Sequence, residues 1–364
     1  MRKKTDQLLL AALRTALWGN PLEVEAFAVL SAEEWTTLYK QSAEQGVLAL
    51  VYDALQSLPK EVQPPRGVRL QWAVNVERIE KRYAQQERAI ATLASFCLGH
   101  NLPLMLLKGY GLSRNYPIPH HRPCGDIDIW LYGRQAEADR LLRDERGVRI
   151  DEDKHHHTVF TFEGVMVENH FDFLNVHAHR SNRVIEARLQ ELAGEGDEVI
   201  EVQGTQVCLP SPDFNALFLL RHAAAHFAAV EIGLRHVVDW ALFVHHYRDR
   251  IHWTALEEMA RAMNMHRFLY AMQGIAVDEL GVSSEKLPHF ERNATLQERV
   301  LQEILNPEFS APAPARNPLK IVWYRFRRWW ANRWKHRMVY SEGLFSTFWV
   351  QVWSHLLKPK SIIH

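Results

Sequence analysis

Cysteine is scarce in this chain, with three in 364 residues. Cys97, Cys124 and Cys208 lie far apart and form no Cys-x-x-Cys pair, which argues against a disulfide framework and favours reduced thiols in a cytoplasmic protein. Net charge is also absent, because 43 Lys and Arg residues balance 43 Asp and Glu residues. No overall electric field therefore attracts nucleic acid or an anionic membrane, and such a partner would have to bind a local patch.

Long apolar runs are missing as well, and no stretch is long enough to cross a bilayer. The basic residues 1–6 lead into an apolar segment at 8–17 that contains Arg14 and is followed by no small-residue cleavage site. We therefore expect an amphipathic helix there and not a signal peptide. Neither a Walker A motif nor the glycine-rich loop of protein kinases occurs in the sequence, which counts against two common classes of phosphate-transfer enzyme.

The most informative feature present is a pair of carboxylates one residue apart, in the apolar stretch Gly-Asp-Ile-Asp-Ile-Trp-Leu at 125–131. In a strand, side chains i and i+2 leave the same face. Asp126 and Asp128 should therefore lie side by side, while Ile127 and Ile129 face the apolar core. Two anions held this close favour a cation between them.

A third carboxylate is expected on a neighbouring strand. The sequence predicts a hairpin with strands at 158–162 and 165–171, joined by Glu-Gly at 163–164. Glu168 is the candidate, since it lies inside the apolar run of the second strand, whereas Asp172 lies on the same face near the strand end. Hard divalent ions such as Mg²⁺ prefer oxygen ligands of this kind.

A phosphate site is predicted next to the carboxylates. Residues 104–107 form an apolar strand that runs into Lys108 and Gly109, and 110–116 are expected to form a short helix. Exposed N–H groups at a helix start, a glycine that permits close approach, and a lysine together suit a phosphate group. Metal-binding carboxylates beside such a site point to phosphoryl or nucleotidyl transfer.

Several short motifs in this order carry a family resemblance. They are Leu-Lys-Gly-Tyr-Gly-Leu at 107–112, Tyr-Pro at 116–117, Arg-Pro at 122–123, Gly-Asp-Ile-Asp-Ile at 125–129 and Val-Glu-Asn-His at 167–170. The sequence resembles the uncharacterised bacterial nucleotidyltransferase family of the DNA polymerase beta superfold, which is related to the toxin nucleotidyltransferases of abortive-infection systems. The resemblance is strongest over 103–132 and extends to about residue 176.

The resemblance implies an α+β fold: a polymerase-beta-like nucleotidyltransferase core, with a small mixed sheet backed by helices, flanked by N- and C-terminal helical regions. It also implies a nucleoside triphosphate donor and Mg²⁺ or Mn²⁺ at Asp126, Asp128 and Glu168. The wider superfold has Gly-Gly or Gly-Ser at its phosphate-binding turn, where this chain has Lys108 and Gly109. Lys108 is then either a direct charge on the triphosphate or a lysine at a strand end.

The expected reaction is transfer of a nucleoside monophosphate to a hydroxyl acceptor with release of pyrophosphate. Lys108, the Gly109 backbone and Arg122 would offset charge on the leaving phosphates. The acceptor stays open among a small molecule, a protein and RNA. Two alternatives remain: a catalytically silent nucleotide-binding or interaction module, and a kinase-like enzyme that transfers the γ-phosphate.

Histidines supply further candidates. In the run Lys-His-His-His at 154–157, adjacent side chains diverge, so at most two can meet one ion. His156 is the candidate for contact with the triphosphate or the acceptor. In the other interpretation, the histidine run is only the polar start of the strand. His170 either orients the Glu168 carboxylate or is a packed strand residue.

A second group of polar residues lies on helices further along the chain. His222 and His226 are four residues apart, as are Arg235 and Asp239, so each pair shares a helical face. A metal site, hydrogen-bonded core histidines and a helix ion pair are all compatible with this spacing. By family resemblance, His226 or Asp239 would instead face the nucleotide or the acceptor.

Four regions are predicted: a helical region at 1–100, the nucleotidyltransferase core at 101–210, a helical domain at 211–310 and a basic, aromatic helical segment at 311–364. Within them we expect a capping box at 31–34 and, at 198–209, two short strands or one bent strand. Further helices are predicted at 71–98, 135–145, 214–227, 234–247, 253–263 and 267–280.

Tryptophans and arginines alternate at 323–337. Such interleaving fits three interpretations. The tryptophans can pack on the body of the protein while arginine stems cover apolar surface. They can also stack on single-stranded RNA, or settle at a membrane surface.

Overall fold

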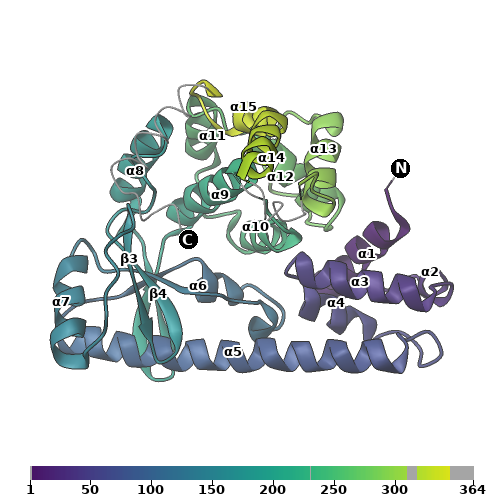
Figure 1. The fold of residues 1–364 in the computed structure, drawn as a ribbon, viewed down its shortest axis with the longest axis horizontal. Coiled ribbons are helices and arrows are strands. Elements are labelled where there is room, and N and C mark those ends of the chain that lie inside the picture. The colour runs from purple at the N-terminus through teal and green to yellow at the C-terminus, as the bar shows by residue number, and fades with distance from the viewer. Residues whose placement is uncertain (1, 230, 310–317, 345–364) are drawn as a thin grey trace. The chain divides into compact units, whose positions relative to one another are not determined.

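The computed structural model describes residues 2–229, 231–309 and 318–344, and in them six strands form one mixed sheet (Figure 1). The strand order is β3-β4-β2-β1-β6-β5. The strands are β1 Met105–Leu107, β2 Ile127–Trp130, β3 His157–Phe162, β4 Val165–His170, β5 Glu198–Val202 and β6 Thr205–Leu209. The predicted α+β class, with a small mixed sheet backed by helices, is confirmed.

Helices make up most of the remaining chain. Before the sheet come α1 Lys4–Trp18, α2 Val24–Ala28, α3 Ala32–Glu44, α4 Leu48–Leu55 and α5 Arg66–Gly99. Between strands lie α6 Gly109–Ser113, the 3₁₀ helix η1 Pro119–His121, α7 Gln135–Arg146 and α8 Arg180–Leu192. After the sheet follow α9 Pro212–Ala229, α10 Leu234–Tyr247, α11 Trp253–Ala262, α12 His266–Asp278, α13 Ala294–Leu305, α14 Pro318–Ala331 and α15 Arg333–Val339.

The chain divides into two compact units. The first, called the helical unit here, contains residues up to 76 together with 220–249 and 253–344. The second, called the sheet unit, contains 77–219 and 250–252 among the described residues. The four-region division predicted from the sequence stays a prediction.

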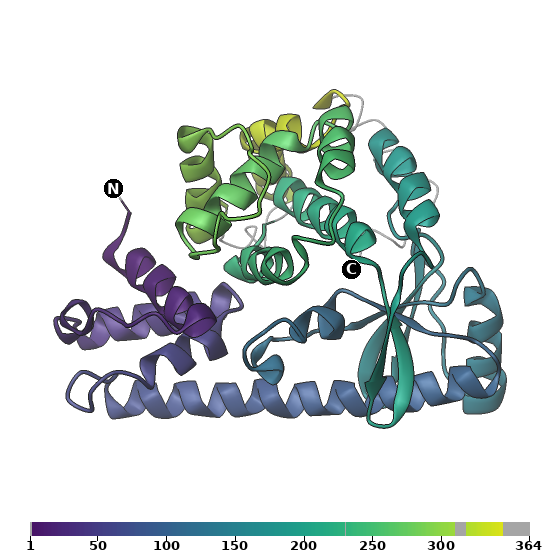
Figure 2. The same cartoon turned by 180° about the vertical axis from the view of Figure 1, so that it is seen from behind.

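In the sheet unit, strand pairing follows a mixed pattern. β1 is antiparallel to β2 and parallel to β6, and β2 is parallel to β4. β3–β4 and β5–β6 are antiparallel hairpins, which can be followed in Figure 2. One face packs on α5 and α7, where Ile129 and Val167 join Leu93 and Leu142 in one apolar cluster. Side chains alternate between the two faces of a strand. The residues that adjoin Ile129 in β2 and Val167 in β4 therefore point to the other face of the sheet.

The β3–β4 hairpin has the predicted two-residue turn. Glu163 and Gly164 both have positive φ, 48° and 76°, as a type I′ turn requires. A side chain at Gly164 would also meet Gln85 Nε2 at 2.9 Å, and this amide donates to the Glu163 carbonyl oxygen. The turn therefore fixes the register that positions β4.

A buried polar network ties α7 to this hairpin. One carboxylate oxygen of Asp139 accepts a hydrogen bond from Asn169 Nδ2 at 2.8 Å, and the other accepts from Thr158 Oγ1 at 2.8 Å. All three side chains are buried. We expect Asp139→Ala to lower the free energy of unfolding by roughly 2–3 kcal/mol, because it leaves buried donors without partners. Urea unfolding measures this, with the exposed Asp144→Ala of the same helix as control; equal stability of the two variants would contradict the prediction.

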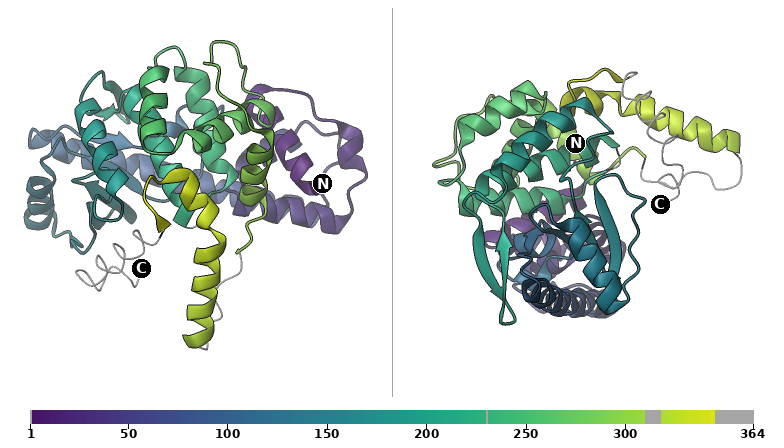
Figure 3. Two further views of the ribbon diagram at one scale, coloured as in Figure 1. Left: turned by 90° about the horizontal axis from the view of Figure 1, so that it is seen from above. Right: turned by 90° about the vertical axis from the view of Figure 1, so that its left-hand side faces the viewer.

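The helical unit contains α1–α4 and α10–α15. Its α12 packs against α10, α13 and α15, and these helices are seen from two further sides in Figure 3. The predicted capping box is confirmed, since Ser31 Oγ accepts from Glu34 N and the Glu34 carboxylate accepts from Ser31 N. Arg2 binds Glu279 through two hydrogen bonds of 2.6 Å, which ties the start of the chain to the end of α12.

Several sequence-based boundaries need correction. The long helix α5 begins at Arg66, five residues earlier than predicted, and α6 ends at Ser113 instead of residue 116. Residues 198–209 form two strands, which decides between the two alternatives. Helices α8 and α13 were not predicted. Among the described residues, no helix combines the length and the apolar character that a membrane crossing requires.

The basic, aromatic segment has two different environments within its described part. In α15 most residues are buried or half-buried, and the guanidinium of Arg299 lies 4.0 Å from the centroid of the Trp334 ring. On α14, Trp323, Phe326 and Trp330 are exposed. Packing thus accounts for α15, and contact of α14 with RNA or a membrane surface stays a prediction. Residues 311–317 and 345–364 of the predicted segment lie outside the described residues.

Candidate functional site

Two parallel neighbouring strands bring predicted site residues together. β2 and β4 pair so that Asp128 lies beside Glu168. Ile127 and Ile129 belong to the apolar core, which leaves Asp128 on the opposite face, as the strand period predicts. Ligand atoms of Asp128, Glu168 and His170 lie within 4.8 Å of one another. The expected third carboxylate is therefore next to the Asp128 carboxylate, while Asp172 lies beyond the end of β4.

Lys108 contacts the Asp128 carboxylate. It follows β1, whose Leu107 pairs with Asp128, and its Nζ lies 2.9 Å from Asp128 Oδ1. Burial alone would lower the pKa of Lys108, but the Asp128 carboxylate, and then Glu168 and Asp126, raise it above its usual value. Lys108 thus stays a cation. The sequence predicts a contact with the triphosphate, whereas in the structure its partner is a carboxylate.

The Asp128 carboxylate is held ionised by two donors. It is 4% exposed, and His170 Nε2 lies 3.0 Å from the same oxygen that Lys108 contacts. Burial would raise the pKa of Asp128, yet Lys108 and His170 move it well below its usual range. His170 Nδ1 lies 3.1 Å from the Asp172 carbonyl oxygen. Of the two roles considered for His170, orienting a carboxylate fits the structure, and its closest carboxylate is Asp128 instead of Glu168, which lies at 3.7 Å.

Asp126 is positioned by the backbone around it. The sequence predicts Asp126 within a strand, but β2 begins one residue later, at Ile127. Arg82 and Gln86 of α5 donate to the carbonyl oxygens of Gly125 and Asp126, at 2.8 and 3.3 Å. Gly109, with φ of 30°, approaches closely, since a Cβ there would lie 3.6 Å from the Asp126 carbonyl oxygen. Gly109 therefore lies next to Asp126, and α6 begins at Gly109, one residue before the predicted start.

The donor set fits a divalent cation. Burial, and then the negative charges of Asp128 and Glu168, raise the pKa of Asp126. This means that the three carboxylates repel one another despite the nearby Lys108. A divalent ion would relieve the repulsion, and carboxylate oxygens are the ligands that Mg²⁺ and Mn²⁺ prefer.

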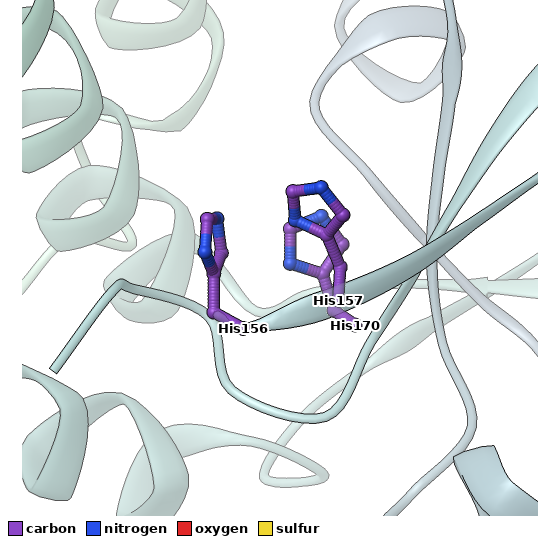
Figure 4. A group of neighbouring side chains, drawn as sticks. All are labelled: His156, His157 and His170. Carbon is purple, nitrogen blue, oxygen red and sulfur yellow. The ribbon is translucent and has the colours of Figure 1, made fainter. Parts of the chain in front are cut away.

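Histidines border the carboxylates where β3 begins. His156 and His157 lie beside His170, with the three rings close together in Figure 4. Burial lowers the pKa of His156 to about 2 and that of His157 to about 4. His157 was not among the predicted site residues, yet its Nε2 lies 3.7 Å from Glu168 Oε1. The signal that could have found it is the hairpin register, which pairs His157 with His170.

Comparison with known protein families shows the general class of the chain. The sequence profile of a family described as Uncharacterised nucleotidyltransferase matches residues 31–281, more than half of the chain. The chain belongs to this family. The match includes the whole segment from Lys108 to Glu168 and supports nucleotidyl transfer as the general activity. The predicted link to abortive-infection toxins stays a prediction.

Other comparisons add little to the family assignment. The crystal structure of an antigenic nucleotidyltransferase-like protein from Paracoccidioides brasiliensis is similar at 12% sequence identity and a TM-score of 0.35, over 56% of this chain and 97% of that one. No curated protein matches this chain significantly.

Three other residues predicted for this nucleotidyltransferase lie outside the carboxylate cluster. Arg122 is buried in the segment before β2, where its guanidinium donates to Cys124 Sγ at 3.1 Å. His226, whose ring centroid lies 4.4 Å from that of His222, and the buried Asp239 belong to the helical unit. Contacts of Arg122 with phosphate, and of His226 or Asp239 with the nucleotide or the acceptor, stay predictions.

Proposed function

We propose that this protein is a metal-dependent nucleotidyltransferase that moves a nucleoside monophosphate from an NTP to a hydroxyl acceptor and releases pyrophosphate. The observation that carries the proposal is the pair of Asp128 and Glu168, with Asp126 close enough for all three charges to interact and Lys108 bound to Asp128, in a chain of the nucleotidyltransferase family. Separate strands and loops supply these groups, and the sheet holds them in a fixed arrangement.

In this proposal each residue has a defined task. Asp126, Asp128 and Glu168 would hold Mg²⁺ or Mn²⁺, which neutralises charge on the α-phosphate and lowers the pKa of the acceptor hydroxyl. His170 keeps the Asp128 carboxylate oriented and ionised. Lys108 neutralises Asp128 in this structure and would supply a positive charge to the triphosphate of a bound nucleotide.

Phosphate contacts complete the proposed site. Gly109 offers a backbone N–H without a side chain that would obstruct the leaving phosphates, and Arg122 adds a second positive charge. The donor is an NTP, and the acceptor is a small molecule, a protein or RNA. The exposed aromatic face of α14 is the proposed contact for a macromolecular acceptor or a membrane surface. We propose a cytoplasmic location, in accord with the few, widely spaced cysteines.

The decisive experiment uses labelled nucleotides. Purified protein is incubated with each α-labelled NTP, Mg²⁺ or Mn²⁺ and a cell lysate, and we expect label in one acceptor fraction together with release of pyrophosphate. Omitting metal should abolish both. In a parallel incubation with γ-labelled NTP, transfer of label with release of the nucleoside diphosphate would identify a kinase-like enzyme instead. Calorimetric NTP binding without turnover would identify the silent module.

A further inference from the structure

Three histidines at the start of β3 and the end of β4 form a cluster, and two of them, His156 and His157, have no task in the proposed nucleotidyl transfer. His156 immediately precedes β3, His157 begins β3 and His170 ends β4. The ring centroids of His156 and His157 are 4.3 Å apart, and those of His157 and His170 are 5.0 Å apart. We call these three residues the histidine cluster. Figure 4 shows their rings side by side at the start of the hairpin.

The cluster is held in place by the backbone of the sheet. His157 and His170 are register partners in the antiparallel pair β3–β4. The carbonyl oxygen of His156 accepts hydrogen bonds from the N–H groups of Phe171 and Asp172, both at 3.1 Å. His155, the first histidine of the run, lies apart from the cluster and has its ring 5.9 Å from that of His177.

Two nitrogens of the cluster have unmet bonding capacity. Nδ1 of His156 and Nδ1 of His157 are buried, and neither has a hydrogen-bond partner among the described residues. His157 is 8% exposed and His170 is 2% exposed. Buried polar atoms almost always have a hydrogen-bond partner, so two buried nitrogens without one indicate that the cluster can bind a ligand.

The spacing suits a single metal ion. One ligand nitrogen from each of the three histidines lies within 4.8 Å of the other two. Zinc–nitrogen bonds are about 2.0–2.1 Å long, so nitrogens at tetrahedral angles on one ion lie roughly 3.3–3.4 Å apart. Side-chain rotations that bring the nitrogens together by at most about 1.5 Å would therefore suffice.

A fourth ligand is already nearby. Glu168 lies between two of the histidines, with Oε1 3.7 Å from His157 Nε2 and Oε2 3.7 Å from His170 Nε2. His170 also has the outer contact that is typical of metal-bound histidine, because its other nitrogen, Nδ1, faces the Asp172 carbonyl oxygen at 3.1 Å. Nε2 of His170 is then the ligand atom, and a bound ion would replace its 3.0 Å contact with Asp128 Oδ1.

We propose that His156, His157 and His170, together with Glu168, bind a transition-metal ion of the Zn²⁺ class next to the carboxylate site. Three imidazoles select such ions over Mg²⁺, which prefers oxygen ligands. Two of its ligands, His156 and His157, take no part in nucleotidyl transfer as proposed here, whereas His170 also holds the Asp128 carboxylate. Through Glu168 it shares one ligand with the proposed Mg²⁺ site.

Co²⁺ tests the proposal, because it replaces Zn²⁺ and its visible absorption reports its coordination. The full chain is titrated with Co²⁺ in excess Mg²⁺, and we expect one Co²⁺ per chain with the intense absorption of a four- or five-coordinate ion, which Zn²⁺ then displaces. His156→Ala and His157→Ala should each weaken Co²⁺ binding at least about tenfold. His155→Ala, from the same run but outside the cluster, is the matched control and should bind as the wild type does.

Other outcomes would overturn the proposal. These are Co²⁺ binding that persists unchanged in the His156→Ala/His157→Ala double variant, an equal loss in His155→Ala, or histidine-dependent binding of inorganic triphosphate in place of Co²⁺. Circular dichroism checks that each variant is folded, and His157→Gln replaces His157→Ala if the latter is not. Asp126→Asn should keep the Co²⁺ signal, so failure of the metal proposal and failure of the transfer proposal can be told apart.

Discussion

Replacing Asp126 with asparagine should abolish nucleotidyl transfer and leave the fold intact. Loss of one metal-binding carboxylate removes several kcal/mol of transition-state stabilisation, and about 4 kcal/mol corresponds to a roughly 10³-fold slower rate. Stability should not fall, because burial and then the neighbouring carboxylates raise the pKa of Asp126. A raised pKa means that the ionised Asp126 carboxylate lowers the stability of the folded state at neutral pH, and asparagine removes this charge.

The measurement is incorporation of α-label into the acceptor, together with urea unfolding of the same preparations. Asp144→Asn on the exposed face of α7 is the control for an aspartate-to-asparagine change far from the carboxylates. Full transfer activity in Asp126→Asn would remove Asp126 from the mechanism. A large loss of stability would show instead that its charge is needed for folding.

Asp128→Asn should behave differently from Asp126→Asn, because it should cost both activity and stability. The Asp128 carboxylate is buried and paired at 2.9 Å with Lys108, whose side chain is 16% exposed. Removing one partner leaves a buried charge unpaired, which typically costs about 3–5 kcal/mol. We therefore expect a correspondingly lower urea midpoint for Asp128→Asn.

The double variant Asp128→Asn/Lys108→Met separates the two effects. It removes the unpaired charge along with the carboxylate, so stability should recover largely while transfer stays abolished. Lys108→Met alone completes the double-mutant cycle. If Asp128→Asn is as stable as the wild type, the ion pair does not contribute to the stability of the folded state.

Much of the site was predictable from strand periodicity. Alternation placed Ile127 and Ile129 in the core and Asp128 on the opposite face, as observed. The Glu-Gly turn fixed the hairpin and therefore the face that Glu168 occupies. Both predictions depend on local geometry, since the side-chain period of a strand is two and a type I′ turn has strict backbone requirements.

The sequence analysis did not predict helix α8, because its buried face is partly polar. Helix α8 buries Ile185 and Leu189, but Glu186 and Asn182 are buried too, and Val184 is exposed. The apolar period is therefore weak. The reason is tertiary: the Glu186 carboxylate accepts hydrogen bonds from backbone N–H groups of the segment after β4. For α13 the signal was present, since its Asn293 cap and its apolar residues have regular helical spacing.

The sequence by itself determined which chemical groups this protein has and which of them share a strand face, because both follow from residue order and local periodicity. Only the tertiary structure decided their partners. Lys108 contacts Asp128 and does not lie in an open phosphate site, and Glu168 and His170 lie beside Asp128. These contacts arise from pairing β2 with both β1 and β4. Such pairing joins distant segments of the chain, and its register depends on how the whole sheet packs on its helices.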